Sequence, residues 1–234
     1  MNTIAIIPLK PVLSTSKSRL SGVIDKHGRM AMTLMMLSTV LKAIEQSKVI
    51  EQTVVVGGDS WIGDIRPSLR NVHWIKDNNK GLNKALSQGI RFGFDQHADA
   101  VLFLPADLPL ITKEDLCKLV ETSHGGKYLV ICPAKRDKGT NALLIPREAN
   151  FRPALGKSSF FKHWQQSIDL GFQTTMYYST NLGIDLDTLK DLKLCQELIP
   201  SFWKEVEEWK NSILDYAKSS HNHMLQSNID VVNR

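Results

Sequence analysis

The sequence lacks any apolar run long enough to cross a membrane. Its longest apolar runs have the length of a strand, well short of the ~20 residues that a spanning helix needs. The first residues, MNTIAIIPLKP, also lack the charged start, long apolar stretch and small-residue cleavage site of a signal peptide. We therefore expect no membrane partner and a cytoplasmic location.

Cysteine is scarce, with three residues that lie far apart: Cys117, Cys132 and Cys195. None belongs to a CxxC pair, which argues against a disulfide framework or a zinc site and fits a reducing compartment. We expect three buried, unreactive thiols.

Several familiar motifs are missing as well. The chain has no Walker GxxxxGK[ST] spacing, GxGxxG loop, GxSxG elbow or Ser-His-Asp pattern. Only His221 and His223, in the polar tail, have the spacing of paired metal ligands. For His163 we expect a surface or half-buried role, with contact to an anion as the alternative. A net charge of +5 without interleaved basic and aromatic residues argues against a nucleic-acid partner. The charge suits either an ordinary solvated surface or attraction of a phosphorylated small molecule.

What the sequence does contain is an alternation of short apolar strands with helices. It predicts strands at 4–7, 53–56, 72–75, 101–104, 128–132 and 141–145. It predicts helices at 26–46, 81–94 and 113–123, a short helical piece before residue 72, and a helix that starts near Ser159. This pattern favours an α/β fold, with a mostly parallel sheet and helices on both faces.

A change of character near residue 200 suggests a domain over 1–200 followed by an appendage over 201–234. The appendage begins with an amphipathic stripe of large apolar residues at helical spacing: Phe202, Val206, Trp209, Ile213 and Tyr216. We expect this helix to pack on its own domain, with a dimer contact as the alternative. The polar tail from residue 219 is expected to fray.

Three acidic residues are the first candidates for chemistry. Asp107 lies in VLFLPADLPL, just past a buried strand, where open α/β sheets bind ligands. Asp185 and Asp187 have DxD spacing, which puts both carboxylates on one face of an extended segment. Together they indicate a divalent-metal site. As an alternative for the DxD segment, Thr188 caps a following helix with Asp191 in its first turn.

The loop after the first strand, residues 8–21, is the second candidate. A strand–loop–helix junction offers backbone N–H donors and the positive end of a helix dipole, and nearby cations complete a phosphate cradle. The alternative is a solvated loop. Its cations and hydroxyls are Lys10, Lys17, Arg19, Ser14, Thr15, Ser16, Ser18 and Ser21.

A third candidate is a group of small polar donors beside the expected ends of a strand and a helix. They suit a phosphate or carboxylate, and Gly156 permits close approach of the backbone. The alternative is ordinary turn chemistry and a helix N-cap. The donors are Thr140, Asn141, Gly156, Ser158 and Ser159.

These motifs together resemble those of the CofC family, the 2-phospho-L-lactate guanylyltransferases of coenzyme F420 biosynthesis. The resemblance covers about residues 3–197, where PLKP, KSRLS, GLNKALSQG, LPADLPL, DKGTNALL, FRPALGKSSFFKH and GIDLDT occur in this order. It implies a nucleotidyltransferase fold of the glycosyltransferase-A-like type, with a Rossmann-like mixed sheet. It also implies that GTP is joined to a phosphorylated three-carbon acid with release of pyrophosphate.

The acceptor implied by the resemblance is 2-phospho-L-lactate, with lactyl-2-diphospho-5′-guanosine as product. Related enzymes use phosphoenolpyruvate or 3-phosphoglycerate, so these remain alternatives. A sugar or molybdenum-cofactor nucleotidyltransferase would usually show a GG-rich first loop, which is missing here. A non-catalytic nucleotide-binding module is a further alternative.

The resemblance also implies roles for individual residues. Asp107, Asp185 and Asp187 match the ligands of Mg²⁺, and Thr140, Gly156 and Ser159 match positions that hold the phospho-acid. Lys17 and Arg19 match the basic phosphate loop and are expected to act with Asp107 in catalysis. The nucleotide is expected to contact Pro8, Leu9, Lys10, Lys17, Gly81 and Asn83. We expect a homodimer.

Overall fold

Seven strands form one sheet in the described part of the chain, which comprises residues 1–12, 17–59, 61–66, 69, 72–77 and 81–219 of a computed structural model. The sheet order is β3-β2-β1-β4-β6-β5-β7, and only β6 runs antiparallel to its neighbours. The strands are β1 (Thr3–Leu9), β2 (Gln52–Gly57), β3 (His73–Ile75), β4 (Ala100–Phe103), β5 (Leu129–Pro133), β6 (Thr140–Pro146) and β7 (Thr174–Met176). The predicted α/β class is confirmed; the short edge strand β7 was not predicted.

The long helices follow the predicted periodicity, and α2, α5 and α7 begin at side-chain caps made by Asp25, Thr112 and Thr188. They are α2 (Lys26–Ser47), α3 (Ile62–Ile65), α4 (Leu82–Asp95), α5 (Lys113–Thr122), α6 (Ser159–Asp169), α7 (Leu189–Leu198) and α8 (Phe202–Ser219). Thr188 caps α7 in a reciprocal capping box with Asp191, so the predicted cap is confirmed. Ser14, Thr15 and Ser16 of the loop after the first strand lie outside the described residues.

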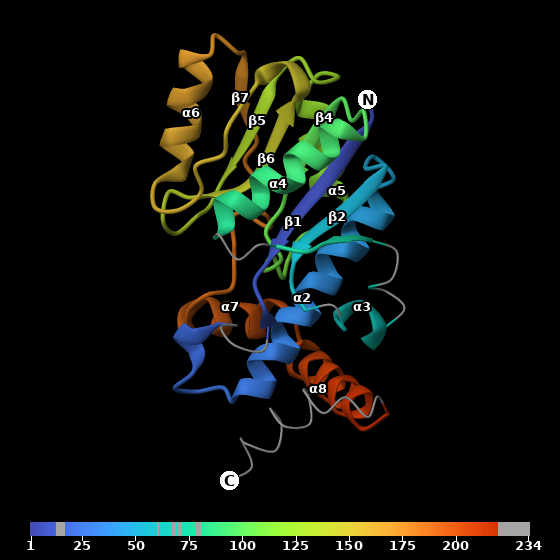
Figure 1. Cartoon of the computed structure of the whole chain (residues 1–234). Helices are drawn as coiled ribbons and strands as arrows, with labels where there is room; N and C mark the ends of the chain where they lie inside the picture. The colour runs from blue at the N-terminus through green and yellow to red at the C-terminus, as the bar shows by residue number, and fades with distance from the viewer. Residues whose placement is uncertain (13–16, 60, 67–68, 70–71, 78–80, 220–234) are drawn as a thin grey trace.

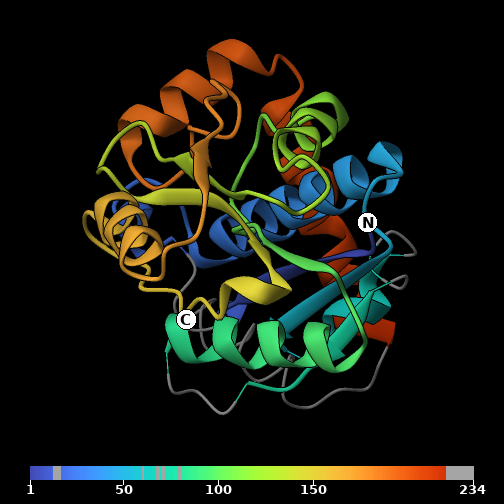
Figure 2. The ribbon, with the colours of Figure 1, turned by 90° about the horizontal axis from the view of Figure 1, so that it is seen from above.

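Helices cover both faces of the sheet, with α4 on one side and α2 and α5 on the other (Figures 1 and 2). Successive side chains of a strand point to opposite faces. In β1, Ala5 and Ile7 therefore pack towards α2, whereas Ile4 and Ile6 pack towards α4. Each face of the sheet thus has its own apolar core.

The C-terminal helix α8 packs against α2 and shares its core (Figure 1). Phe202, Val206, Trp209 and Ile213 are all buried there. The prediction that this helix packs on its own domain is confirmed. The division at residue 200 and the homodimer stay predictions, and the tail from 220, with His221 and His223, lies outside the described residues. Among the described helices, none is long and apolar enough to span a membrane.

The three thiols are free, and two of them match the expectation. Burial raises the pKa of Cys132 to about 12 and that of Cys195 to about 11, which makes both unreactive. The prediction was wrong for Cys117, which is only half-buried. Its Sγ donates to the carbonyl of Ser47 at 3.5 Å, at the end of α2.

The order of the strands locates the site. From central β1 the chain moves to β2 and β3 on one side, then returns to β4 on the other side of β1. The loops that follow β1 and β4 therefore diverge at their carboxyl ends, which is the switch point where open α/β sheets bind ligands. Antiparallel β6 starts at this same edge, so its first residue, Thr140, lies there too.

Candidate active site

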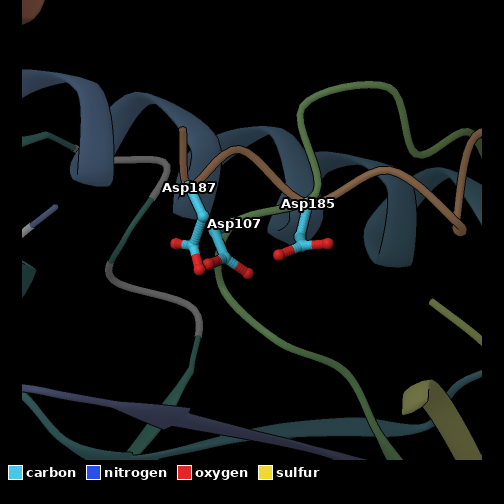
Figure 3. Close-up of side chains that lie close together, drawn as sticks. All are labelled: Asp107, Asp185 and Asp187. Atoms are coloured by element: carbon cyan, nitrogen blue, oxygen red, sulfur yellow. The ribbon is translucent and has the colours of Figure 1, made fainter. Parts of the chain in front are cut away.

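Three carboxylates converge at this edge of the sheet (Figure 3). Asp107 follows β4, while Asp185 and Asp187 lie on the segment between β7 and α7. Each side chain offers an oxygen, and these oxygens all lie within 4.8 Å of one another. The backbone N–H of Leu186 donates to the carbonyl of Asp107 at 3.2 Å, which joins the two segments.

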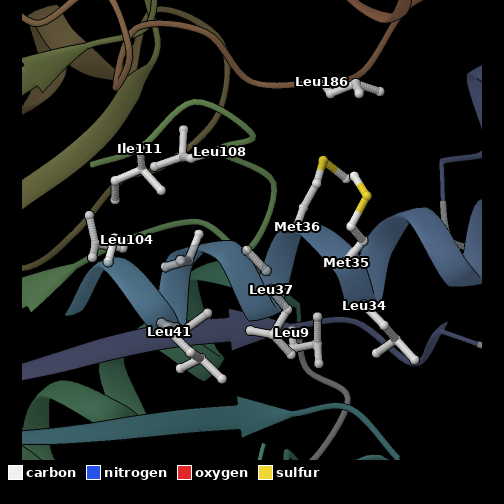
Figure 4. Packing of buried hydrophobic residues seen from close by; sticks show 14 of the residues in the cluster. Leu9, Leu34, Met35, Met36, Leu37, Leu41, Leu104, Leu108, Ile111 and Leu186 are labelled. Carbon is white, nitrogen blue, oxygen red and sulfur yellow. The ribbon is translucent and has the colours of Figure 1, made fainter. Parts of the chain in front are cut away.

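Leu186 explains why its two acidic neighbours face the same way. Its side chain is fully buried in the core with Met35 and Met36 of α2 (Figure 4). In an extended segment the residues on either side must then point away from that core. The alternation of one buried leucine between two acids therefore aims Asp185 and Asp187 at the site.

Lys17 is the cation in closest contact with the cluster. Its Nζ donates to Asp107 Oδ2 at 2.6 Å and to Asp187 Oδ1 at 3.0 Å, and only 7% of its side chain is exposed. Burial alone would lower the pKa of Lys17, but the two carboxylates outweigh burial and hold the pKa above its ordinary value. Lys17 is therefore an ammonium at neutral pH. Arg19 is more exposed and lies 3.4 Å from Asp187.

Arg136 is a site residue that sequence reasoning missed. It lies on the turn between β5 and β6, and its Nη2 contacts Asp185 at 2.9 Å and Asp187 at 3.3 Å. Its Nη1 contacts Asp191 at 2.8 Å. Nothing in the stretch AKRDKG sets this arginine apart from the two lysines beside it, because its role depends on what lies across the turn.

The two DxD carboxylates differ in their electrostatic surroundings. Burial and the nearby charge of Asp107 raise the pKa of Asp185, although Arg136 opposes this shift. Burial would also raise the pKa of Asp187, but Lys17 and Arg136 outweigh it and the pKa is lowered. Asp187 is thus held more firmly in its charged form than Asp185.

The donor set fits a magnesium ion. Mg²⁺ binds carboxylate oxygens and usually keeps open positions for water and substrate phosphates. The three carboxylates are partly exposed, with 26%, 16% and 34% of the side chains of Asp107, Asp185 and Asp187 accessible. The ammonium of Lys17 already lies between two of them, which shows that this point favours positive charge.

Two hollows adjoin across the acidic cluster. The first is bordered by the end of β1 and by the loop that follows it, which we call the basic loop because it carries Lys10, Lys17 and Arg19. The second is bordered by the β5–β6 turn and the start of α6. Both reach Asp107 and Asp187, together with Arg19, Leu82, Phe103 and Pro105. The predicted residues that line the first are Pro8, Leu9, Lys10, Lys17, Arg19 and Asp107; those that line the second include Thr140, Gly156, Ser159 and Asp185.

The predicted nucleotide residues Gly81 and Asn83 line neither of these hollows. Both side-chain groups of Asn83 are engaged by the backbone of Leu155. The N–H of Leu155 donates to Asn83 Oδ1 at 2.7 Å, and Asn83 Nδ2 donates to the carbonyl of Leu155 at 3.2 Å. Asn83 therefore ties the start of α4 to the wall of the second hollow, and its contact with nucleotide stays a prediction.

The prediction for His163 was wrong, because its side chain is fully buried rather than half-buried or on the surface. Its Nδ1 lies 2.9 Å from Thr140 Oγ1, and its Nε2 accepts the backbone N–H of Ala154 at 2.9 Å. Burial, aided by the charge of Lys162, lowers the pKa of His163 to about 4. The imidazole is neutral at neutral pH.

This buried histidine predicts that the protein loses stability in mild acid. The pKa of His163 is about 6.5 in the unfolded chain and about 4 in the folded protein. The free energy of unfolding therefore falls as the pH drops between these values, because the unfolded chain gains the proton first. Between pH 7.5 and 5 we expect a loss of about 2 kcal/mol from this residue. Urea unfolding at both pH values checks it.

A matched pair of variants isolates the effect. His163→Asn should lose this part of the pH dependence, whereas His97→Asn, at an exposed position, should keep it. Equal pH dependence in the native protein and His163→Asn would contradict the assignment.

Comparisons with known proteins support a nucleotidyltransferase fold. A nucleotidyl transferase from Methanothermobacter thermautotroptrophicus is similar with a TM-score of 0.60 at 14% identity, covering 86% of this chain and 99% of that one. A 4-diphosphocytidyl-2C-methyl-D-erythritol synthase also has a TM-score of 0.60, at 15% identity, covering 85% and 98%. At such low identity these similarities establish the fold alone.

Sequence relatives are closer. A phosphoenolpyruvate guanylyltransferase of Rubrobacter xylanophilus is 34% identical over 192 residues, which are 82% of this chain and 92% of the relative. A 2-phospho-L-lactate guanylyltransferase of Methanosphaera stadtmanae is 27% identical over 233 residues, 97% of this chain and 90% of the relative. The family model described as "Guanylyl transferase CofC like" matches residues 3–199. That match includes the three aspartates, the basic loop and Thr140. The chain belongs to the CofC family of guanylyl transferases.

Proposed function

We propose that this protein transfers a guanylyl group from GTP to the phosphate of a small phosphorylated three-carbon acid. One observation carries the proposal: two hollows meet at Asp107 and Asp187, one with the basic loop and one with small hydroxyl donors. The first suits a triphosphate and the second a small anion. The expected acceptor is 2-phospho-L-lactate, as a step of coenzyme F420 biosynthesis, with phosphoenolpyruvate and 3-phosphoglycerate as alternatives. The relatives named above support both the first and the second acceptor.

The reaction needs two anions to approach each other. An oxygen of the acceptor phosphate attacks the α-phosphorus of GTP, the bond from that phosphorus to the bridging oxygen breaks, and pyrophosphate leaves. With 2-phospho-L-lactate the product is lactyl-2-diphospho-5′-guanosine. The acceptor is already ionised near neutral pH, since the second pKa of a phosphate monoester is about 6. It therefore needs no general base, and positioning and charge neutralisation do the catalysis.

The residues of the site divide this work. Lys17 and Arg19, beside the first hollow, neutralise charge that develops on the leaving pyrophosphate. Asp107, Asp185 and Asp187 would hold Mg²⁺, which as a Lewis acid supplies further charge neutralisation when bound. Arg136 keeps Asp185 and Asp187 oriented towards the site. Thr140, Gly156 and Ser159 bind the acceptor.

The decisive experiment supplies GTP and Mg²⁺ with each of the three acids separately and follows the release of pyrophosphate. We expect 2-phospho-L-lactate to react fastest and its product to be identified by mass spectrometry. Equal rates with all three acids would contradict the choice of acceptor, and faster turnover of ATP than of GTP would contradict the choice of base. Absence of turnover with every acid would favour a nucleotide-binding module without catalysis.

A further inference from the structure

A buried chain of hydrogen bonds links the wall of the second hollow to Thr140. The backbone N–H of Ala154 can only donate, so His163 Nε2, 2.9 Å away, must carry a lone pair. The neutral ring then carries its proton on Nδ1. Nδ1 lies 2.9 Å from Thr140 Oγ1 and donates to it. His163 is 0% exposed and Thr140 7%, so water does not compete for these contacts.

The tautomer of His163 decides whether the hydroxyls of Thr140 and Ser159 have a proton left for a ligand. Thr140 Oγ1 also accepts the hydroxyl of Ser159 at 3.2 Å, so both of its lone pairs are occupied. Of the two hydroxyl protons in the Thr140–Ser159 pair, one lies between the two oxygens and the other is left for a third partner. Were the proton on Nε2 instead, Thr140 would have to donate to Nδ1. Both hydroxyl protons would then be consumed inside the protein.

We infer that His163 is a positioning residue, which makes the Thr140–Ser159 pair a hydrogen-bond donor towards an anionic oxygen in the second hollow. Thr140 and Ser159 both line that hollow. A phosphate or carboxylate oxygen only accepts hydrogen bonds, and a donor from a buried hydroxyl binds it strongly. The inference rests on the proposed function, because it concerns how the phosphorylated acid is held.

The same ring also fixes the wall of the hollow. The backbone N–H of Ala154 is bound by His163 and the next one, of Leu155, by Asn83. The edge of the ring packs against Phe151 with centroids 5.5 Å apart, which resists a flip of the imidazole. His163 thus sets both the direction of the hydroxyl proton and the position of the loop that carries Gly156.

Three variants separate these two contributions. In His163→Asn the shorter amide lies near the place of Nδ1 and can donate to Thr140, but it loses the bond to Ala154. In His163→Gln the longer amide reaches the place of Nε2 and can accept from Ala154, but it loses the donation to Thr140. His163→Leu removes both.

The readout is the KM for the phospho-acid against the KM for GTP. We expect the KM for the acid to rise about 10-fold to 100-fold in His163→Leu and His163→Gln, as for loss of one hydrogen bond to a charged group. In His163→Asn it should stay within about threefold of the native value, and the KM for GTP should change in none of them. A Gln variant as good as the Asn variant, or a parallel rise in the KM for GTP, would overturn the inference.

A second measurement is independent of turnover. Nitrogen NMR of the substrate-free protein, labelled in histidine, reports which ring nitrogen carries the proton, and the His163 signal is identified by its loss in His163→Asn. We expect a proton on Nδ1; a proton on Nε2 overturns the inference. If the native protein turns over no acid, the proposed function fails, and the affinity of each variant for inorganic phosphate then replaces KM with the same expected order.

Discussion

Asp107→Asn is expected to lower the rate of pyrophosphate release from GTP by about 10³-fold. Asp107 is the carboxylate that both hollows share with Asp187, and it accepts the shortest contact of Lys17, at 2.6 Å. The amide keeps the shape of the side chain but removes its charge, which weakens both the hold on a cation and the orientation of the lysine. The rate of pyrophosphate release with saturating GTP, acceptor and Mg²⁺, measured for the variant and the native protein, gives the loss of activity.

The fold should survive this change. The contact that joins the two acid segments runs from Leu186 N–H to the backbone carbonyl of Asp107, which the substitution leaves in place. Thermal unfolding followed by circular dichroism should show a native-like transition. Asp95→Asn, at an exposed position near the end of α4, is the matched control and should retain full activity. A fully active Asp107→Asn protein would contradict the catalytic role assigned to Asp107.

Lys17→Met is expected to slow turnover by about 10²-fold and also to destabilise the protein. The methionine keeps the apolar stem but withdraws the ammonium from between Asp107 and Asp187. Removing one partner of a buried ion pair is costly, but these carboxylates are about a quarter to a third exposed. We therefore expect a loss of about 2 kcal/mol at pH 7, less than for a fully buried pair.

The pH dependence of that loss has a definite sign. Lys17 lowers the pKa of Asp187, so the stability gained from this carboxylate is present above its unfolded pKa near 3.8 and is lost as the pH falls through the folded value. The difference between the native protein and Lys17→Met should therefore shrink below about pH 4. Lys17 itself has a raised pKa, so its contribution persists to pH 10.5 and disappears above it.

Urea unfolding at pH 7 and pH 3.5 measures the difference in the free energy of unfolding between the native protein and Lys17→Met. Added Mg²⁺ should restore part of the stability of the variant at pH 7. Lys42→Met, on an exposed face of α2, is the control and should unfold like the native protein. A constant difference between Lys17→Met and the native protein at both pH values would contradict the electrostatic account.

Local sequence patterns were enough to predict most of the sheet and the long helices. Strands such as 101–104 are continuous apolar runs, and α4 carries a clear apolar stripe, so burial on both faces or on one face is readable without the fold. The missed strand β7 has three residues at the sheet edge, none of them buried. Such a segment pairs because β5 lies beside it, not because of its own pattern.

The site shows the same division. The acids could be predicted because Asp107 follows a buried strand and the DxD spacing puts two carboxylates on one face. Arg136 and His163 could not. An arginine in a polar turn and a histidine in a helix have many ordinary roles. Their contacts with Asp185 and Thr140 join residues 49 and 23 positions apart in the chain.

By itself the sequence determined the α/β class, the family and the types of side chain that carry the chemistry, because periodicity and motifs are local properties. Only the tertiary structure decided that Lys17 lies between two aspartates, that Asn83 binds the backbone of Leu155 and that the buried His163 accepts the backbone N–H of Ala154. Protonation, hydrogen-bond direction and ion pairing depend on what surrounds a group, and those surroundings come from segments distant in the chain.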